Sequence, residues 1–166
     1  MNKKTKPNKI FGIDPGSTKI GYGVIHKNDQ EEPTLIDYGY IDLRKPLNVG
    51  KRLLQLYKDL SFLISKHKPD SIAVESIYFF KNAKTITPVI QSKGVILYTA
   101  AKANVNVFEY TPLQVKQTIS GYGKAHKDLI QKLVQSALNY KNTIKPDDAS
   151  DALAIALCHL RHLTRS

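Results

Sequence analysis

Four acidic residues stand where their carboxylates could share a divalent metal ion. Asp14 ends the apolar segment 9–13, and Glu75 ends the apolar segment 71–74. Asp148 and Asp151 are three residues apart, so a helix places them on one face. Clustered carboxylates repel one another unless a proton or a cation neutralises them, and oxygen ligands in this number suit Mg²⁺ or Mn²⁺. Two such ions can activate a water and stabilise the leaving oxygen of a phosphodiester.

Each of these acids also has a structural interpretation. Asp14 precedes Pro15-Gly16 and can form a turn, Glu75 can be a surface residue, and Asp148 with Asp151 can cap a helix. Residue by residue these alternatives stay open. Taken together on a basic chain, the four acids favour a metal site.

Apolar periodicity and turn residues predict the elements that would carry the acids. Strands are expected at 9–13, 21–25, 34–43, 71–75 and 105–110, and helices over the leucines of 53–63, from 87, from 111, over 129–138 and over 148–163. Thr87-Pro88 is typical of a helix cap followed by proline at the first position, and 111–114 has the form of a capping box. Asp148 is expected at the cap of the last helix. His159 and His162 are expected to interact with the C-terminal dipole of that helix.

This order predicts an α/β fold with a five-stranded mixed sheet and helices on both faces. The first three strands form an antiparallel meander, and right-handed crossover helices make strands 9–13, 71–75 and 105–110 parallel. If 9–13 and 71–75 are neighbours, Asp14 and Glu75 leave the sheet at the same edge. The carboxyl edge of such a sheet is where ligand sites occur.

Length and composition indicate one globular domain. The chain has 166 residues, of which 42% are hydrophobic, and a single cysteine, Cys158, which indicates a reducing compartment. The longest apolar run, 152–158, is too short to cross a bilayer, and the N-terminus lacks the apolar segment of a secretory signal. We therefore expect a cytoplasmic protein without membrane contact, with a basic tail over 1–9 and one domain over 10–166.

The net charge is +11, and the excess is confined to two regions. The first is the tail 1–9, which carries +4. The second is the stretch 81–145, in which residues 81–110 carry +3 and residues 111–145 carry +5. A basic surface of this kind suits a polyanion such as nucleic acid, although a solvated face that maintains solubility explains the charge equally well. An anionic membrane is a weaker candidate because no strongly amphipathic basic helix is evident.

Five ordered blocks resemble the RuvC family of bacterial Holliday junction resolvases. The likeness runs from about residue 9 to residue 161, nearly the whole chain. The blocks are Phe11-Gly-Ile-Asp-Pro-Gly-Ser-Thr-Lys-Ile-Gly-Tyr-Gly-Val24, Val74-Glu75 with Lys81-Asn82, Val115-Lys-Gln-Thr118, Gly121-Tyr-Gly123 and Asp148-Ala-Ser-Asp-Ala-Leu-Ala154.

The resemblance implies an RNase H-like fold and a homodimer that nicks four-way junction DNA symmetrically with Mg²⁺, two ions per site, Mn²⁺ substituting. It implies that the four carboxylates are catalytic metal ligands. It also implies basic active-site roles for Lys116 and Lys127 and stacking of Tyr78 on a base near the junction centre. Lys81, Lys84 and Lys124 are expected as further DNA contacts. A RuvA–RuvB branch-migration complex is the implied partner.

The chain departs from the family pattern at two places. Tyr78 stands where the family often has phenylalanine, which keeps the ring but adds a hydroxyl. The basic tail 1–9 is an addition, either a DNA-contacting arm or a solubilising one. His126, beside Lys127, could orient water or contact phosphate, but an ordinary surface role suits it as well.

Three other functions remain open at this stage. The segment 14–18 also resembles the phosphate-binding turn of sugar kinases and actin-like ATPases, which are much longer chains; ATP hydrolysis without DNA would distinguish them. A non-catalytic junction-binding module would bind without Mg²⁺ and never nick. A nuclease of the same fold that acts on RNA is the third.

Overall fold

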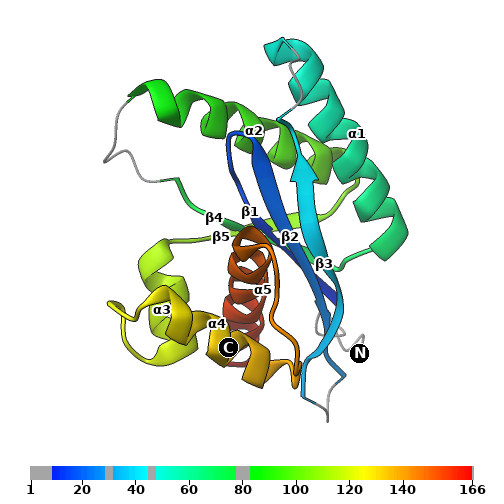
Figure 1. Cartoon of the computed structure of the whole chain (residues 1–166). Helices are drawn as coiled ribbons and strands as arrows, with labels where there is room; N and C mark the ends of the chain where they lie inside the picture. The colour runs from blue at the N-terminus through cyan, green and yellow to red at the C-terminus, as the bar shows by residue number, and fades with distance from the viewer. Residues whose placement is uncertain (1–8, 29–31, 45–47, 78–82, 166) are drawn as a thin grey trace.

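The computed structural model describes residues 9–28, 32–44, 48–77 and 83–165 (Figure 1). Its sheet has five strands in the order β3-β2-β1-β4-β5. The pairs β1/β2 and β2/β3 are antiparallel, whereas β1/β4 and β4/β5 are parallel. The predicted meander and crossovers are therefore confirmed. The strands are β1 (Lys9–Asp14), β2 (Lys19–His26), β3 (Thr34–Asp42), β4 (Ser71–Glu75) and β5 (Asn106–Tyr110).

Helices cover both faces of the sheet, as predicted (Figure 1). On one face lie α1 (Val49–His67) and α2 (Ala83–Lys102). On the other lie α3 (Pro112–Ser120), α4 (Lys127–Ala137) and α5 (Asp147–Arg165), and α5 packs mainly on β1 and β2. Within the described ranges, no helix is long and apolar enough to span a membrane.

The side chains of β1 alternate between the two faces. Phe11 and Ile13 belong to the core under α1 and α2, whereas Ile10 belongs to the core under α5. Because successive side chains of a strand point to opposite faces, Gly12 and Asp14 follow Ile10 toward α5. The last residue of β1 is thus directed to the same face as the last helix.

Local signals set the start of α3, as the sequence predicted, and the end of α1. In α3, Thr111 and Gln114 form both hydrogen bonds of the capping box. After α1, Lys68 takes the left-handed conformation that terminates a helix and is followed by Pro69.

Three sequence predictions about the helices and their ends are wrong. α2 begins at Ala83 rather than after Thr87, so Pro88 lies inside the helix. A proline there cannot donate to the carbonyl four residues earlier, but the buried positions Ser92 and Ile96 pack the helix onto the protein. α5 begins at Asp147, so Asp148 is in its first turn and not at its cap.

His159 is the third correction. It is buried, and its ring nitrogens contact the Tyr110 hydroxyl at 2.7 Å and the Ser71 hydroxyl at 3.1 Å. Burial lowers the pKa of His159 to about 4, so this side chain is neutral at pH 7 and does not interact with the helix dipole as a cation. His159 instead connects β5 and β4 to α5.

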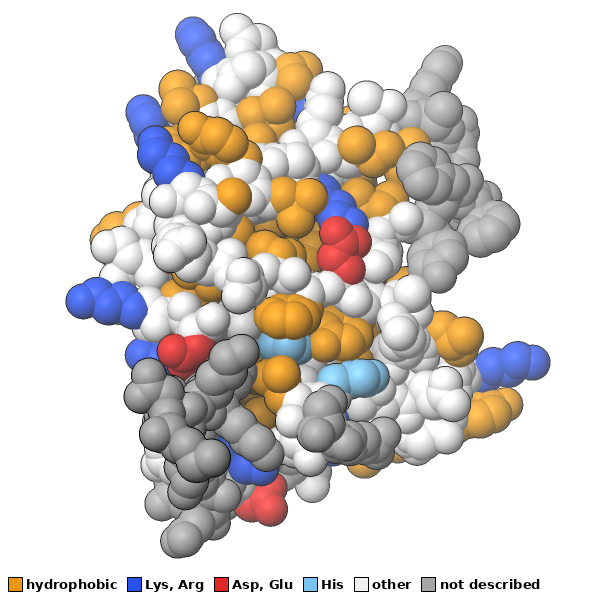
Figure 2. Space-filling view, turned by 180° about the vertical axis from the view of Figure 1, so that it is seen from behind, with side chains coloured by type: hydrophobic (Ala, Val, Ile, Leu, Met, Phe, Trp, Pro, Cys, Tyr) orange, Lys and Arg blue, Asp and Glu red, His pale blue; other side chains and the backbone are white. Residues whose placement is uncertain are grey.

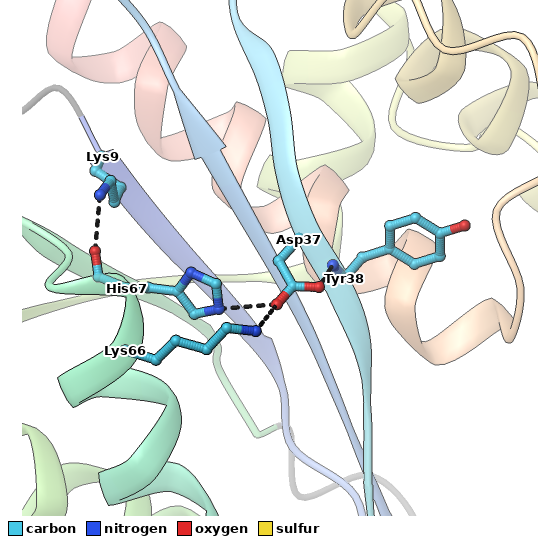
Figure 3. Close-up of polar contacts among 5 residues, drawn as sticks. All are labelled: Lys9, Asp37, Tyr38, Lys66 and His67. Atoms are coloured by element: carbon cyan, nitrogen blue, oxygen red, sulfur yellow. Dashed lines mark hydrogen bonds and ion pairs between the residues drawn. The ribbon is translucent and has the colours of Figure 1, made fainter.

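The end of α1 is fastened to two strands by polar contacts (Figure 3). Asp37 of β3 accepts a hydrogen bond from the Lys66 ammonium at 2.9 Å, and its carboxylate lies 2.9 Å from Nε2 of His67. Lys9, expected at the end of the N-terminal tail, is the first residue of β1 and donates to the His67 carbonyl at 2.8 Å. These contacts fix α1 against the edge strand β3 and the start of β1.

The face seen from behind carries apolar side chains across its middle, with lysines and arginines mostly toward its rim (Figure 2). On α2, an apolar row with helical spacing remains exposed to solvent: Ile90, Gly94, Leu97 and Ala101. A Cβ on Gly94 would meet no atom within 4 Å. The described chain therefore covers this row of α2 only in part.

Three glycines let α5 lie directly on the backbone of β1 and β2. A Cβ on Gly12 would collide with the carbonyl oxygen of Ala152, and a Cβ on Gly21 would collide with that of Asp148. Gly23, the register partner of Gly12 in β2, has no room for a Cβ beside Leu153. The distance between α5 and the sheet thus depends on the absence of side chains at these positions.

Gly12→Ala tests this close approach. The added methyl group meets helix backbone, which cannot rotate away, so we expect a loss of about 2–4 kcal/mol in the free energy of unfolding. The matched control is Gly50→Ala in the first turn of α1, where the nearest atom to a Cβ is 3.7 Å away. That change should be neutral or stabilising by up to about 1 kcal/mol. Urea denaturation of both variants measures the difference, and equal stabilities would contradict the role of Gly12.

Candidate active site

Two of the four predicted carboxylates project from neighbouring strands at one edge of the sheet. Asp14 ends β1 and Glu75 ends β4, and the preceding residues Ile13 and Val74 are register partners in a parallel pair. Ala73 belongs to the core under α5, so the alternation of β4 directs Glu75 to that same face. The prediction that both acids leave the sheet together is confirmed.

The first turns of α5 bring the other two carboxylates to this edge. The carbonyl of Asp148 lies against Gly21, whose register partner in β1 is Asp14. Asp151 lies one turn further along and lines the same cleft as Glu75. All four side chains are half-buried.

The carboxylates act on one another electrostatically. Burial is the main cause that raises the pKa of Asp14 to about 8, followed by the charge of Glu75. Asp151 and Asp148 contribute in the same direction, and the Lys127 ammonium acts against them. A proton is therefore retained on Asp14 near neutral pH when no cation is present.

Glu75 and Asp151 show the same effect. Burial, followed by the Asp151 charge, raises the pKa of Glu75 to about 7, while Lys116 acts against that shift. Burial is also the main cause that raises the pKa of Asp151. Strongly shifted carboxyl groups that gather in a cleft are typical of functional sites.

A cleft of about 190 Å³ opens between β4, α3, α4 and α5. Its charged lining consists of Glu75, Asp151, Lys116 and Lys127, and its apolar lining is Pro112, Val115, Ile130 and Ala154. A larger hollow of about 540 Å³ lies between the ends of α1 and α2, but no carboxylate lines it. The smaller cleft therefore holds the groups that can do acid–base or metal chemistry.

Lys127 is the basic group in closest contact with the carboxylates. Its ammonium donates to Oδ2 of Asp151 at 3.1 Å and lies 3.5 Å from Oδ2 of Asp147. Desolvation lowers the pKa of Lys127, but these contacts outweigh it and the pKa is raised overall. Lys127 is thus a positively charged partner that already partly neutralises the site.

The donor set fits a divalent cation, although its side chains do not converge on one point. Among the described residues, no three His, Cys, Asp or Glu side chains form a ready ligand group. Asp151 is directed to Lys127, and burial followed by neighbouring negative charge raises the pKa of Asp14 to about 8 and that of Glu75 to about 7. A hard cation accepts these oxygen donors and offsets both the burial and the mutual repulsion that raise the pKa of Asp14 and Glu75.

Of the remaining predicted site residues, one lines the cleft, one is exposed between two helices, and the side chains of three lie outside the described residues. Lys116 is exposed on α3 at the cleft, and Lys124 is exposed between α3 and α4. Lys84 is in the first turn of α2, but its side chain is outside the described residues. Tyr78 and Lys81 also lie outside them.

Sequence reasoning missed two residues beside the site, Asp147 and Gln131. Asp147 is the first residue of α5 and contacts Lys127, and Gln131 of α4 donates to Asp147 at 3.1 Å. The adjacent acids 147–148 and the four-residue spacing of 127 and 131 were the available signals. His126 is exposed at the N-cap of α4, and its side chain makes no capping hydrogen bond.

Comparisons with known proteins identify close relatives over nearly the whole length. The family model described as crossover junction endodeoxyribonuclease RuvC matches residues 10–159. The crossover junction endodeoxyribonuclease RuvC of Caldicellulosiruptor saccharolyticus is 46% identical over 152 residues, which cover 92% of each chain.

Solved structures agree with this match. Thermus thermophilus RuvC in complex with Holliday junction substrate superposes with a TM-score of 0.88 at 29% identity, covering 93% of this chain and 94% of that chain. The yeast mitochondrial Holliday junction resolvase Ydc2 has a TM-score of 0.69 at 14% identity, covering 99% of this chain and 84% of that chain, and shows the shared fold.

The shifted pKa of Asp14 predicts how the metal-free protein depends on pH. In the unfolded chain the pKa is near 3.8 and in the folded protein it is about 8, so folding disfavours the charged form and stability is lost as the pH rises between these values. Asp14→Asn removes this penalty. In EDTA we expect the variant to be more stable than the parent by roughly 1–2 kcal/mol at pH 8, and by less at pH 5.

The measured quantity is the difference in the free energy of unfolding between the two proteins, obtained by urea denaturation. The difference is used because His159 contributes equally to the pH dependence of both. Asp128→Asn, at an exposed position in the first turn of α4, is the control and should show no such trend. A difference that is constant with pH would contradict the shifted pKa.

Proposed function

Since the chain belongs to the RuvC family of crossover junction endodeoxyribonucleases, we propose that its four clustered carboxylates, two of which line the cleft, resolve Holliday junctions by paired, symmetric nicks in recombination and repair. The observation that supports this site most directly is the joint rise in the pKa of Asp14 and Glu75, two acids from neighbouring strands. Uncompensated carboxylates at the edge of an open cleft suit a metal-dependent nuclease.

We assign the metal-ligand roles to Asp14, Glu75, Asp148 and Asp151. Two bound Mg²⁺ ions, or Mn²⁺ ions in their place, would supply an activated water and stabilise the leaving oxygen. Asp14, from β1, is the acid on which the charges of the other three converge, so it is the candidate to bridge both ions. Hydrolysis by in-line displacement would leave a 5′-phosphate and a 3′-hydroxyl.

The two lysines of the cleft serve the phosphate rather than the metal. Lys116 projects from α3 and Lys127 from α4, and both line the cleft that Glu75 and Asp151 also line. Ammonium groups there can neutralise the non-bridging oxygens of the scissile phosphate and position it for attack. The remaining proposed DNA contacts are Lys81, Lys84, Lys124 and, by stacking, Tyr78.

Selectivity for a junction follows from shape rather than base edges. Lysines bind phosphates without reading sequence, so their affinity falls as salt rises and does not itself distinguish a junction from a duplex. The geometry of four arms around a centre supplies that distinction. A RuvA–RuvB complex as partner and a cytoplasmic location belong to the same proposal by family resemblance.

A twofold-symmetric substrate requires two equivalent sites, and we propose that α2 forms the homodimer contact. An isologous dimer needs a surface that is complementary to itself. The exposed row of Ile90, Gly94, Leu97 and Ala101 is apolar and includes a glycine that permits close approach of a second helix. It lies on the face of the sheet opposite to α5, so pairing there leaves the cleft open.

A nicking assay tests the enzymatic role. A synthetic four-way junction and a linear duplex of the same sequence are incubated with the protein in Mg²⁺, in Mn²⁺ and in EDTA. We expect paired symmetric nicks on the junction alone, lost in EDTA. Asp14→Asn should bind the junction but cut it at about one hundredth of the parental rate or below, because a metal ligand is lost. Asp128→Asn should cut at the parental rate.

Two outcomes would overturn this assignment. Tight junction binding without nicks in either metal would favour a non-catalytic binding module. Loss of junction binding by a well-folded Asp14→Asn would mean that the acid serves the DNA interface and not the metal.

Leu97→Glu tests the dimer contact. Burying a charge in an apolar helix pair is costly, so this variant should sediment as a monomer at concentrations where the parent is a dimer. Its cuts on a junction should become single nicks in place of paired ones. Leu54→Glu, at a similarly exposed position on α1, is the matched control and should remain dimeric. A dimeric Leu97→Glu protein would exclude this face.

A further inference from the structure

α4 and α5 face each other through two pairs of residues with the same spacing. Lys127 and Gln131 are four apart on α4, and Asp147 and Asp151 are four apart on α5, so each pair lies on one helix face. Lys127 contacts both acids, with its ammonium 3.1 Å from Oδ2 of Asp151 and 3.5 Å from Oδ2 of Asp147. Gln131 donates to the other oxygen of Asp147, Oδ1, at 3.1 Å.

The two acids that share Lys127 differ in their surroundings. Asp151 lines the cleft with Glu75, whereas Asp147 does not line it. Asp147 is anchored from the side by Gln131 and is also 3.9 Å from Lys145, whose side chain is 74% exposed and therefore weakly coupled. Asp151 can thus turn to a cation in the cleft, while Asp147 stays with α4.

We propose that Asp147 is a positioning residue that retains the Lys127 ammonium at the rim of the cleft when Asp151 engages the divalent cation. This inference rests on the proposed function, because it assumes that Asp151 is a metal ligand and that Lys127 serves the phosphate. Asp147 itself contacts neither.

The physical reason is a competition for one carboxylate. Lys127 holds Oδ2 of Asp151, so a cation that binds this carboxylate competes with the ammonium for its negative charge. With Asp147 in place, Lys127 keeps a carboxylate partner after the exchange, which makes the exchange less unfavourable. The same contact limits the positions of a long, flexible side chain, so its charge remains where the phosphate would lie.

Asp147→Asn separates the charge of this residue from its hydrogen bond. An asparagine Oδ1 still accepts from Gln131, but the side chain no longer attracts Lys127 electrostatically. The first readout needs no DNA: the rise in Tm with increasing Mn²⁺ reports cation binding to the folded protein. We expect the Mn²⁺ concentration at half of this rise to increase roughly two- to fivefold, the range for loss of one partly exposed charge contact.

Lys127→Met supplies the second half of a double-mutant cycle. This variant frees Asp151, so it should bind Mn²⁺ at a lower concentration than the parent. Adding Asp147→Asn to Lys127→Met should then change nothing, because the residue through which Asp147 acts is absent. Asp128→Asn, an equal change of charge on the exposed side of α4, should leave the titration unchanged.

Junction cleavage at saturating Mg²⁺ is the second readout, and Asp147→Asn should lower it while junction binding persists. The proposal is overturned if Asp147→Asn shifts the Mn²⁺ titration equally in the Lys127→Met background, if it shifts nothing in the parent, or if Mn²⁺ does not raise the parental Tm. If the parent never nicks a junction but the titrations follow the expected cycle, the proposed function fails while the positioning role stands.

Discussion

The direct contact between the α5 backbone and the glycines of β1 and β2 is the constraint on which the site depends. Gly12, Gly21 and Gly23 provide a surface without side chains, and the carbonyls of Ala152 and Asp148 rest on it. A Cβ at Gly12 or Gly21 would meet the α5 backbone and move the helix outward, and the acids of its first turns would move with it. The electrostatic interaction of Asp148 and Asp151 with Asp14 exists because nothing separates helix from sheet. The glycines therefore contribute to the chemistry without touching a ligand.

This close packing gathers negative charge that the fold does not neutralise by itself. Burial and mutual repulsion raise the pKa of Asp14 and Glu75. The Lys127 ammonium neutralises only part of the negative charge of the site. The chain as a whole carries +11, so a polyanion is attracted to the molecule, although the carboxylate site itself is acidic. The carboxylates repel one another, and they also repel the phosphate of a polyanion. A divalent cation removes both repulsions, because it neutralises the acids and gives the phosphate a positive group to approach.

The sequence alone predicted the parts of this arrangement that follow from local pattern and chain topology. Short apolar strands ending in Asp14 and Glu75, joined by a crossover helix, suffice to place both acids at one sheet edge. What it missed depends on contacts between elements. Local propensity predicts a helix start at Pro88 because proline is disfavoured in a helix interior, yet α2 begins at Ala83 and packs onto the protein through buried Ser92 and Ile96. The contact of Lys127 with Asp147 requires the packing of α4 on α5, which no periodicity within either helix encodes.

The alternation of one strand also separates chemistry from assembly. In β1, Phe11 and Ile13 support α1 and α2, while Gly12 and Asp14 support α5 and the cleft. The exposed apolar row of α2 and the carboxylates therefore lie on opposite faces of the same sheet. A dimer formed through α2 would leave both α5 faces, and with them both clefts, open to the arms of one junction. Two cuts on a symmetric substrate then need no communication between the sites, because the symmetry of the dimer already places them.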